Sequence, residues 1–376
     1  MTKKVAVITG SRAEFGLLDP VIRAMKNQAG LDPLIIVAGS HFLPPAETRR
    51  DVEKQYDIAA RVEMQTPGAT GRTADAHAVA RGIAGFTDSF ARLNADWVVV
   101  LGDRIEAFAA ASAASVMGLA VAHIHGGDRA EGIADEAMRH AITKLSHLHL
   151  AATRASAERI ARMGEPEQFI HTVGSPAIDG LASIEPLNER RFRELGEPQA
   201  LFLLHPAGLS EDTERAWATA AIDALGNRRV LALMPNFDAG REPIVRTLHD
   251  AREQRGWTVL DHLPRHEFVA LLKRLAASDG FMIGNSSAAL IEAAALKLPA
   301  IDLGPRQSGR ERADNVVHAD APDRARIAAA IEAGSAVDRA ALTHPYGDGR
   351  SGDRIAALLA RLAPRDPAML RKRCAY

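Results

Sequence analysis

The chain alternates short runs of valine, isoleucine, leucine and alanine with longer segments that are rich in alanine, arginine and glutamate and have the period of a helix. In the first half, six runs have the length and composition of strands: VAVIT, PLIIVAG, WVVVLGD, LAVAHIH, HLHLAA and QFIHTVG. Such alternation is typical of a parallel sheet with crossover helices. Because the runs are almost unbroken, we expect helices to cover both faces of the sheet.

The alternation pauses at residues 178–198, which are rich in proline and charge, and then begins again. Five further runs predict a second sheet: ALFLLHP, VLALMPN, WTVLDHL, GFMIGNSS and PAIDLGP. A chain of 376 residues is also too long for one ordinary core. We therefore predict two Rossmann-like, doubly wound α/β domains, residues 1–180 and 181–376, that face a cleft. The last helix is a candidate to pack back on the first domain.

Charge and cysteine content narrow the class of partner. The 46 Lys and Arg residues balance 47 Asp and Glu residues, so we expect neither nucleic acid nor an anionic membrane as a partner. The single cysteine, Cys374, excludes an internal disulfide framework and a cysteine-based zinc site. The opening MTKKVAVITG predicts a first strand rather than a signal peptide, and no apolar stretch approaches the ~18 residues of a membrane span. We expect a cytoplasmic protein.

Polar side chains follow consecutive strands of the first half, where open α/β sheets bind their ligands. At the first strand end, Arg12 lies where an anion can meet a helix N-terminus, although Ser11 also fits an ordinary helix cap. A carboxylate in a first helical turn, such as Asp135, likewise suits the helix dipole. One such coincidence is expected by chance, whereas several at consecutive ends indicate a site. The residues concerned are Ser11, Arg12, His41, Asp103, Arg104, the HIHGGD cluster of residues 123–128, and Asp135.

The stretch FMIGNSSAALIEAAAL in the second half predicts an anion site. A strand ends at Gly284, and Ser286 and Ser287 lead directly into an alanine-rich helix that carries Glu292 about one and a half turns in. Free N–H groups, hydroxyls and the positive end of the helix dipole together suit phosphate. Ser287 is also expected to cap this helix.

Further polar groups of the second half point to a nucleoside diphosphate. His205 and Asn236 follow the first two strands, and the loop LGPRQSGRERADNV offers Arg306, Arg310 and Arg312 as clamps for phosphate oxygens. The sequence has neither a Walker lysine pattern nor a GxGxxG after the first strand, so no ATP hydrolysis and no nicotinamide cofactor are indicated. We expect a nucleotide-sugar enzyme without a cofactor or metal.

The acid/base groups of such an enzyme would come from the first domain, which faces the sugar while the second domain holds the diphosphate. The reaction needs proton carriers on both sides of the sugar ring, so several ionisable side chains should line one pocket. The candidates are Asp103, His125, Asp128 and Asp135.

The ordered motifs GSRAEFG, GSH, LGDR, HIHGG, DEAMRHAITKLSHLH, GSPAID, PNFDAG, GNSSAALIE and GPRQSGR resemble those of the hydrolysing UDP-N-acetylglucosamine 2-epimerases, over roughly residues 4–320. That family supplies N-acetylmannosamine or a related deoxy sugar for the synthesis of sialic- and legionaminic-type acids. The resemblance implies a fold of the glycosyltransferase-B type. It also implies elimination of UDP to a 2-acetamidoglucal, followed by addition of water that inverts C2.

The resemblance also implies roles for single residues. Asp103 and Asp135 match acidic catalytic positions, and Ser286 and Ser287 match phosphate-binding serines. Glu292 matches a residue near the ribose. The positions that match sugar, diphosphate or nucleotide contacts are Arg12, His41, Arg104, His205 and Arg306.

The chain departs from the family pattern inside its most polar motif. Many members have glutamate where this chain has His125, and Asp128 replaces a longer glutamate. A histidine can exchange protons at neutral pH, so we expect His125 to carry a proton, with a hydrogen-bonding role to Asp103 or to the backbone as the alternative.

Other classes of protein stay open at this point. His123 and His125 lie two apart on a strand and can share a metal in a hydrolase, as can His147 and His149. A sugar transferase of the same fold, or a non-enzymatic protein that binds nucleotide sugars, would also fit these motifs. The sugar, the nucleotide and any regulation stay open, and we expect a homo-oligomer, either a dimer or a tetramer.

Overall fold

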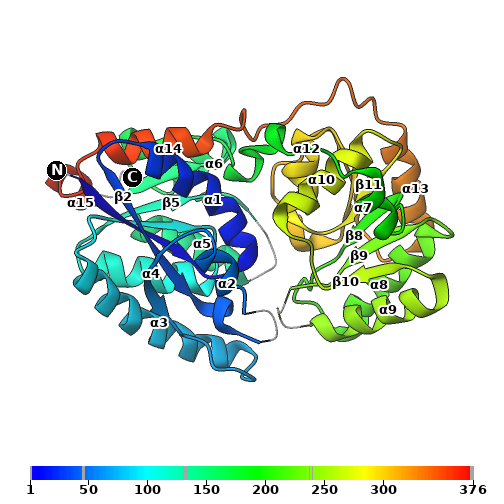
Figure 1. Cartoon of the computed structure of the whole chain (residues 1–376), viewed down its shortest axis with the longest axis horizontal. Helices are drawn as coiled ribbons and strands as arrows, with labels where there is room; N and C mark the ends of the chain where they lie inside the picture. Colours follow the sequence, from blue (N-terminus) through cyan, green and yellow to red (C-terminus); the bar gives the residue numbers. More distant parts are fainter. Residues whose placement is uncertain (1, 45–46, 130–133, 237, 239, 373–376) are drawn as a thin grey trace. The chain divides into compact units, whose positions relative to one another are not determined.

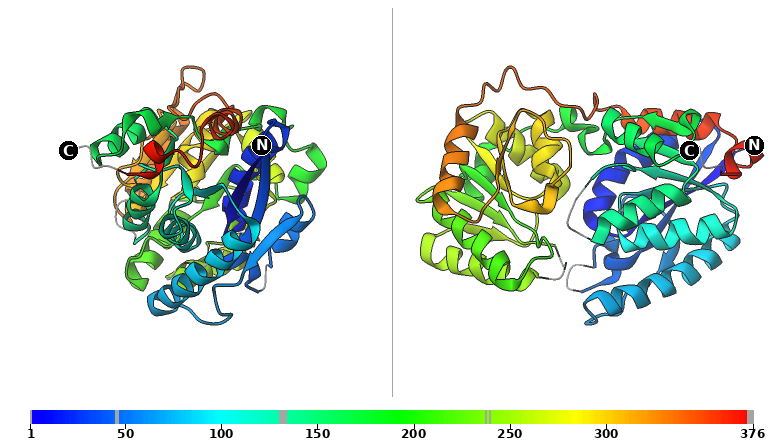
Figure 2. Two further views of the ribbon diagram at one scale, coloured as in Figure 1. Left: turned by 90° about the vertical axis from the view of Figure 1, so that its left-hand side faces the viewer. Right: turned by 180° about the vertical axis from the view of Figure 1, so that it is seen from behind.

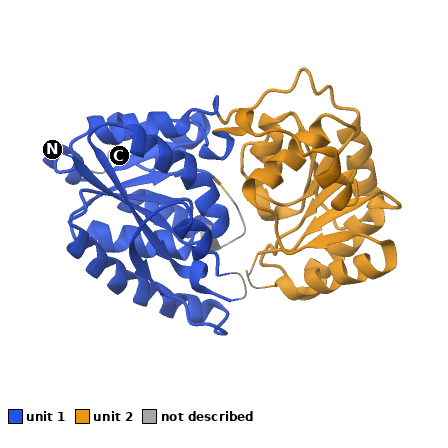
Figure 3. Cartoon of the chain, viewed as in Figure 1, with its two compact units in different colours: residues 1–128, 134–179, 347–376 blue, residues 129–133, 180–346 orange. Residues whose placement is uncertain are grey.

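The computed structural model describes residues 2–44, 47–129, 134–236, 238 and 240–372 (Figure 1). Cys374 lies outside the described residues. The chain divides into two compact units, coloured separately in Figure 3: unit 1 contains residues 1–128, 134–179 and 347–376, and unit 2 contains residues 129–133 and 180–346. Each unit is built on one parallel sheet whose strands alternate with helices. The predicted fold class, two doubly wound α/β domains, is confirmed.

The sheet of unit 1 has the strand order β3-β2-β1-β4-β5-β6-β7, so the chain returns past β1 and continues on its other side with β4. A reversal of this kind opens a ligand crevice beyond the strand ends. The strands are β1 (Lys3–Thr9), β2 (Leu31–Ala38), β3 (Ile58–Val62), β4 (Trp97–Leu101), β5 (Ala120–Ile124), β6 (Leu148–Ala151) and β7 (Ile170–Thr172). The helices are α1 (Arg12–Asn27), α2 (Arg49–Glu53), α3 (Arg72–Leu93), α4 (Ile105–Val116), α5 (Ala134–Leu145), α6 (Arg154–Arg162), α14 (Ser351–Arg361) and α15 (Pro367–Leu370).

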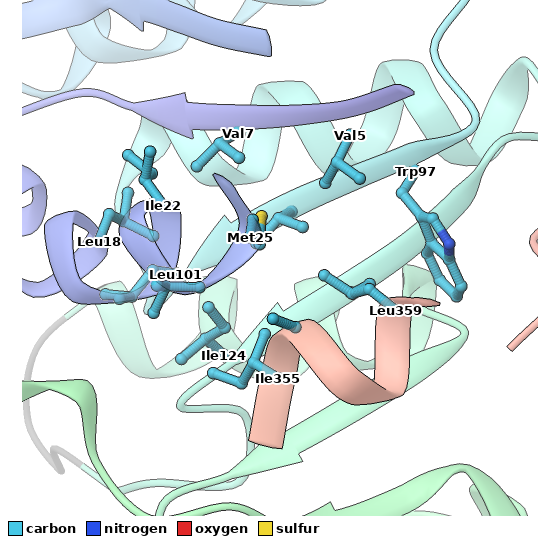
Figure 4. Close-up of a cluster of buried hydrophobic side chains, with 14 of the residues drawn as sticks. Val5, Val7, Leu18, Ile22, Met25, Trp97, Leu101, Ile124, Ile355 and Leu359 are labelled. Carbon is cyan, nitrogen blue, oxygen red and sulfur yellow. The ribbon is translucent and has the colours of Figure 1, made fainter. Parts of the chain in front are cut away.

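Alternate residues of β1 enter two different cores. Val5 and Val7 belong to a cluster that includes side chains of α1 and α14 (Figure 4). Ala6 and Ile8 belong to a second cluster, which includes side chains of α3 and α4. These two helices lie side by side in Figures 1 and 2. Burial on both faces explains why this strand is apolar at successive positions.

Residues 347–376 belong to unit 1 although they come last in the sequence. The Asp179 carboxylate accepts hydrogen bonds from the backbone N–H groups of Ser351 and Gly352, at 3.0 and 2.6 Å, and from the Ser351 hydroxyl at 2.9 Å. N–H groups in the first turn of a helix have no partner within it, so this carboxylate satisfies the start of α14. Ile355 of the same helix is fully buried in the unit 1 core (Figure 4).

The sheet of unit 2 has the strand order β10-β9-β8-β11-β12-β13. Side chains of α8, α9 and α13 pack with its strands in one core that includes Phe202 and Trp257. The strands are β8 (Ala200–Leu203), β9 (Val230–Leu233), β10 (Thr258–Leu260), β11 (Phe281–Gly284), β12 (Ala300–Leu303) and β13 (Val316–Ala319). The helices are α7 (Glu189–Glu194), α8 (Glu211–Leu225), α9 (Arg241–Arg255), α10 (Arg265–Ala276), α11 (Ser287–Leu290), α12 (Glu292–Ala295) and α13 (Arg324–Ser335).

Two strands that the apolar pattern did not indicate, β3 and β13, lie at sheet edges. Arg61 in β3 and His318 in β13 are exposed, so neither strand has the continuous apolar run of a central strand. In the described part of the chain, no helix combines the length and the apolar composition needed to cross a membrane.

Candidate active site

One buried carboxylate, that of Glu106, joins three turns at the carboxyl edge of the unit 1 sheet. Glu106 lies in the first turn of α4 and is 0% exposed. Its Oε1 accepts a hydrogen bond from the Ser40 backbone N–H at 3.3 Å, and its Oε2 accepts one from Nε of Arg104 at 3.3 Å. The Ser40 hydroxyl donates to the Gly10 carbonyl at 2.6 Å. The turns after β1, β2 and β4 are therefore connected.

Two glycines make room for this carboxylate. A Cβ atom on Gly10 would lie 2.6 Å from Cβ of Glu106, and one on Gly39 would lie 2.2 Å from its Oε1. Gly39 also has a φ of 57°, where a side chain is strained. Side chains at these two positions are thus excluded by a residue of α4, which lies far away in the sequence.

Two predicted ligand contacts, Arg12 and His41, adjoin these turns. Arg12 begins α1, its Nη2 is 3.6 Å from Oδ2 of Asp51, and its side chain is 28% exposed. The His41 ring is buried, and its nitrogens contact the hydroxyls of Thr9 and Thr48 at 2.9 and 2.8 Å. Burial lowers the pKa of His41 to about 4. Arg12 is therefore accessible to an anion, whereas the His41 ring already has protein partners on both nitrogens.

A second buried acid, Glu14, lies against the first turn. Its Oε2 accepts a hydrogen bond from the Gly10 backbone N–H at 2.7 Å, and its Oε1 is buried with no partner among the described residues. Burial and the neighbouring Glu106 raise the pKa of Glu14 to about 8, although Arg104 acts in the opposite direction. Glu14 is therefore mainly protonated at neutral pH.

We expect Glu14→Gln to make the stability of the turn after β1 less dependent on pH. The folded-state pKa lies above the unfolded value of 4.5, so the contribution of Glu14 is complete below about pH 4.5 and is lost as pH rises through about 8. The free energy that protects the β1 amides from hydrogen exchange should fall across this window in the parent protein, by at most about 1.4 kcal/mol per pH unit, and less in Glu14→Gln. The exposed Glu63→Gln is the control. Parallel pH profiles for the parent and Glu14→Gln would contradict the expectation.

Asp103, predicted as a proton carrier, is ion-paired with an arginine of α5. Nη2 of Arg139 contacts Oδ2 of Asp103, and the Asp103 side chain is 18% exposed. Arg139 itself is 3% exposed, and its Nη1 donates to the His125 carbonyl at 3.2 Å and lies 4.0 Å from Oδ2 of Asp128. This arginine orients the Asp103 carboxylate while leaving part of it accessible.

His125 stands in a turn with its ring held on both sides. Its φ is 63°, in the left-handed region. Nδ1 is 2.7 Å from Oδ2 of Asp128, and Nε2 is 2.9 Å from the Ser175 hydroxyl. The other carboxylate oxygen of Asp128 accepts from the Ser156 hydroxyl at 2.8 Å. His125, Asp128 and Ser175 are all buried, at 4%, 1% and 0% exposure.

His123 and His125, the pair that could share a metal in the alternative hydrolase, are not on one strand. Strand β5 ends at Ile124, between them. Nε2 of His123 contacts the Gly102 carbonyl at 2.7 Å and its Nδ1 contacts the Thr143 hydroxyl at 3.2 Å, so the two rings have different partners. Burial lowers the pKa of His123 to about 3. Across the described ranges, no three histidine, cysteine or acidic side chains are placed to hold a metal ion.

In unit 2, His205 is oriented by two asparagines. Its backbone N–H donates to Oδ1 of Asn285 at 2.7 Å, and Nδ2 of Asn285 donates to its carbonyl at 2.8 Å. Its Nδ1 accepts from the backbone N–H of Asn236 at 3.1 Å. Burial, followed by the charge of Arg306, lowers the pKa of His205 to about 3. The ring is therefore neutral at pH 7, and because Nδ1 is an acceptor, Nε2 carries the proton.

Arg306 lies beside this histidine. Its Nε donates to the Pro206 carbonyl at 3.2 Å, its Nη1 donates to the Asn285 carbonyl at 3.4 Å, and its Nη2 lies 3.9 Å from Oδ2 of Asp238. The side chain is 14% exposed. His205, Asn285 and Arg306 thus gather at the carboxyl ends of the neighbouring strands β8 and β11.

The predicted phosphate helix differs from the expectation in two ways. It is interrupted at Ile291, whose ψ of −70° separates α11 from α12. The cap is Ser286 rather than Ser287: its hydroxyl accepts from the Ala288 N–H at 3.3 Å. Ser287 begins α11 and is partly exposed, so its hydroxyl and N–H lie at the accessible end of this short helix.

The remaining predicted contacts of unit 2 have protein partners. Oε1 of Glu292 is 2.9 Å from Nη1 of Arg265. Nη1 of Arg310 donates to Oε1 of Gln307 at 3.0 Å. Nε and Nη2 of Arg312 donate to the buried Asp302 at 3.1 and 2.7 Å. Arg306, in the same loop, contacts the carbonyls that follow β8 and β11, whereas Arg312 contacts the end of β12.

Asp135 lies in the first turn of α5, and its side chain falls outside the described part of the structure. Several supporting residues were not predicted from the sequence, among them Glu106, Ser175 and Glu214. Oε1 of Glu214 accepts from the backbone N–H of Ala207 at 2.6 Å and shapes the loop after His205. The spacing of four residues between Asp135 and Arg139, which places them on one helix face, was the one signal for Arg139.

Comparison with known proteins identifies the family of this chain. The family model described as UDP-N-acetylglucosamine 2-epimerase matches residues 23–360. A UDP-N,N'-diacetylbacillosamine 2-epimerase (hydrolyzing) of Legionella pneumophila is 33% identical over 385 residues and covers 100% of both chains. A UDP-N-acetylglucosamine 2-epimerase of Neisseria meningitidis is 31% identical and covers 85% of this chain and 84% of its own length.

A solved structure supports the fold. The UDP-GlcNAc 2-epimerase of Methanocaldococcus jannaschii, in complex with UDP-GlcNAc and UDP, superposes with a TM-score of 0.80 at 19% identity. The alignment covers 95% of this chain and 99% of that one. The match of the family model over most of the sequence, together with full-length similarity at 33% identity, shows that this chain belongs to the UDP-N-acetylglucosamine 2-epimerase family.

Proposed function

We propose that the chain is a hydrolysing 2-epimerase of UDP-linked 2-acetamido sugars, which releases UDP and the free sugar of inverted C2 configuration. The observation that carries this proposal is the full-length similarity to the hydrolysing epimerase of Legionella pneumophila. The substrate class includes UDP-N-acetylglucosamine and its 2,4-diacetamido-6-deoxy analogues, as the names of the two relatives indicate.

The reaction divides into an elimination and a hydration. A base removes the proton from C2, the C–H electron pair forms the C1=C2 double bond, and UDP leaves with the C1–O electron pair. Water then bonds to C1 through its oxygen and gives a proton to a base, while an acid delivers a proton to C2 from the opposite face. Positioned acids and bases contribute about 10²–10⁴-fold each to such steps.

The groups of unit 1 suit the proton transfers. Asp103 is oriented by Arg139 and partly accessible, as a carrier at the sugar must be. We assign the second transfer to Asp135, in the first turn of α5. Arg12 is an accessible cation at the start of α1 and fits a contact with the sugar or phosphate.

The groups of unit 2 suit the nucleoside diphosphate. Hydrogen-bond donors lie at the ends of β8 and β11. They are Nε2–H of the neutral His205, the Arg306 guanidinium, and the hydroxyl and N–H of Ser287. Donors of this kind stabilise the charge that develops on a departing phosphate. UDP should therefore bind unit 2 without any contribution from Asp103.

One incubation tests the function. UDP- and GDP-linked 2-acetamido sugars are supplied in deuterated water without an acceptor, and the products are identified by NMR. We expect free UDP and a free sugar with the manno configuration and deuterium at C2. Release of the sugar with protium at C2 and unchanged configuration would show simple hydrolysis, and a requirement for an acceptor would show sugar transfer; either result would overturn the proposal.

The proposed product indicates the kind of biosynthesis that this enzyme would supply. A free manno-configured 2-acetamido sugar fits the supply of sialic- or legionaminic-type acid synthesis. We further propose that the protein is cytoplasmic and forms a homo-oligomer.

A further inference from the structure

We propose that His125 is a positioning residue, which with Asp128 and Ser175 forms a buried array that holds Arg139 against Asp103. The inference rests on the proposed function, because it assigns Asp103 as the group that exchanges a proton with the sugar. It gives His125 a task that does not require contact with the substrate.

The first step concerns whether a substrate can reach the His125 ring. His125 is 4% exposed and Ser175 is 0% exposed. Nδ1 of the ring is 2.7 Å from Asp128 and Nε2 is 2.9 Å from Ser175. A proton carrier needs a nitrogen within hydrogen-bond reach of the reacting carbon or its attached water. Both nitrogens of this ring instead face buried protein groups.

The second step is the hydrogen-bond pattern, which is complete with one proton on the ring. The Ser175 oxygen accepts from the Ala177 N–H at 3.2 Å, so its own proton is available for Nε2 of His125. Nδ1–H then donates to Oδ2 of Asp128, whose Oδ1 accepts from the Ser156 hydroxyl. Each of these donors has an acceptor. The hydrogen-bonding capacity of both ring nitrogens is therefore used within the protein.

The third step links the ring to the reacting carboxylate. The left-handed backbone of His125, with a φ of 63°, is unfavourable for a residue with a side chain. Its N–H donates to the Leu150 carbonyl at 3.1 Å, and the two ring contacts fix its side chain. In this conformation the His125 carbonyl accepts from Nη1 of Arg139 at 3.2 Å. Nη2 of the same guanidinium contacts Asp103, and Asp128 lies 4.0 Å from Nη1. The array therefore determines where Arg139, and through it Asp103, is placed.

The test uses Ser175→Ala, His125→Asn and the double variant. Asparagine tolerates a left-handed backbone, so His125→Asn removes the ring bridge with little added strain. We expect Ser175→Ala to lower kcat by about three- to tenfold, the equivalent of one neutral hydrogen bond, with KM unchanged within about twofold. The double variant should be no worse than His125→Asn alone, because both substitutions interrupt one array. The pH–rate profile should keep its shape in all three.

The matched control is Ser146→Ala. Ser146 is also buried in unit 1, and its hydroxyl donates to the Ile142 carbonyl at 2.7 Å, outside the array. It should not change kcat. Loss of one limb of the pH–rate profile in His125→Asn, or restoration of its turnover by added imidazole, would show that His125 carries a proton and would overturn the inference. Additive losses in the double variant would do the same.

A measurement on the resting protein separates this inference from the proposed function. The ¹⁵N shifts of the His125 ring should report a protonated Nδ1 and an accepting Nε2, and Ser175→Ala should change the Nε2 shift. If the protein lacks epimerase activity but shows this tautomer, the proposed function fails and the array stands. If the protein is active but the ring is protonated on Nε2 alone, the array as described is wrong.

Discussion

Asp103→Asn should lower kcat by about 10²–10⁴-fold, because an amide of the same shape cannot take up a proton. Asparagine keeps a carbonyl oxygen that can face Arg139 but removes the negative charge of the pair. The affinity for UDP should stay within about tenfold, since the donors assigned to the nucleotide belong to unit 2. Turnover is measured as release of free sugar, and UDP affinity by calorimetry.

The matched control for this substitution is Asp348→Asn. Asp348 also pairs with an arginine of unit 1, Arg354, at 2.8 and 2.7 Å, but its side chain is 57% exposed. It should retain full activity. If Asp103→Asn kept more than a tenth of the parent kcat, or if UDP affinity fell as far as kcat, the proposed role of Asp103 would be refuted.

The combined substitution Ser287→Ala and Arg306→Ala should have the opposite effect and weaken UDP binding by about 10²-fold or more. Hydrogen bonds to charged groups contribute about 1.5–3 kcal/mol each, and this variant removes a guanidinium and a hydroxyl. Calorimetry with UDP alone measures this loss directly. Arg306 also donates to the Pro206 and Asn285 carbonyls, so the thermal midpoint should be recorded alongside the Kd.

Arg326→Ala provides the control for lost positive charge in unit 2, because Arg326 is exposed and pairs with the exposed Asp320. It should leave the Kd for UDP unchanged. Wild-type affinity in the Ser287 and Arg306 variant would place the diphosphate elsewhere and contradict the assignment.

The central strands of both sheets were predictable because burial on two faces leaves a long apolar run in the sequence. The edge strands β3 and β13 were not, because exposed residues such as Arg61 and His318 interrupt the apolar run. Strand-end polar groups, among them Asp103 and His205, were visible because topology places such ends along one edge of a sheet.

The supporting residues were harder to predict, because their partners are distant in the sequence. Ser175 meets His125 across 50 positions, and Glu106 meets Ser40 across 66. Ser175 stands in the motif GSPAID, yet nothing in that motif indicates which ring its hydroxyl contacts. The apparent function of a strand-end side chain also depends on these partners: His41 and His123 were equally visible in the sequence, and both rings are occupied by protein groups.

The attachment of α14 to Asp179 has a consequence for biosynthesis. Unit 2 is almost entirely the continuous stretch 180–346, whereas unit 1 needs the segment that follows it. Domains generally fold as units while the chain emerges from the ribosome. Unit 2 can therefore complete its core before α14 is made, while the same face of the unit 1 sheet is covered by α1 without α14. Until α14 is made, the part of this core that Ile355 closes stays open to water in the nascent chain.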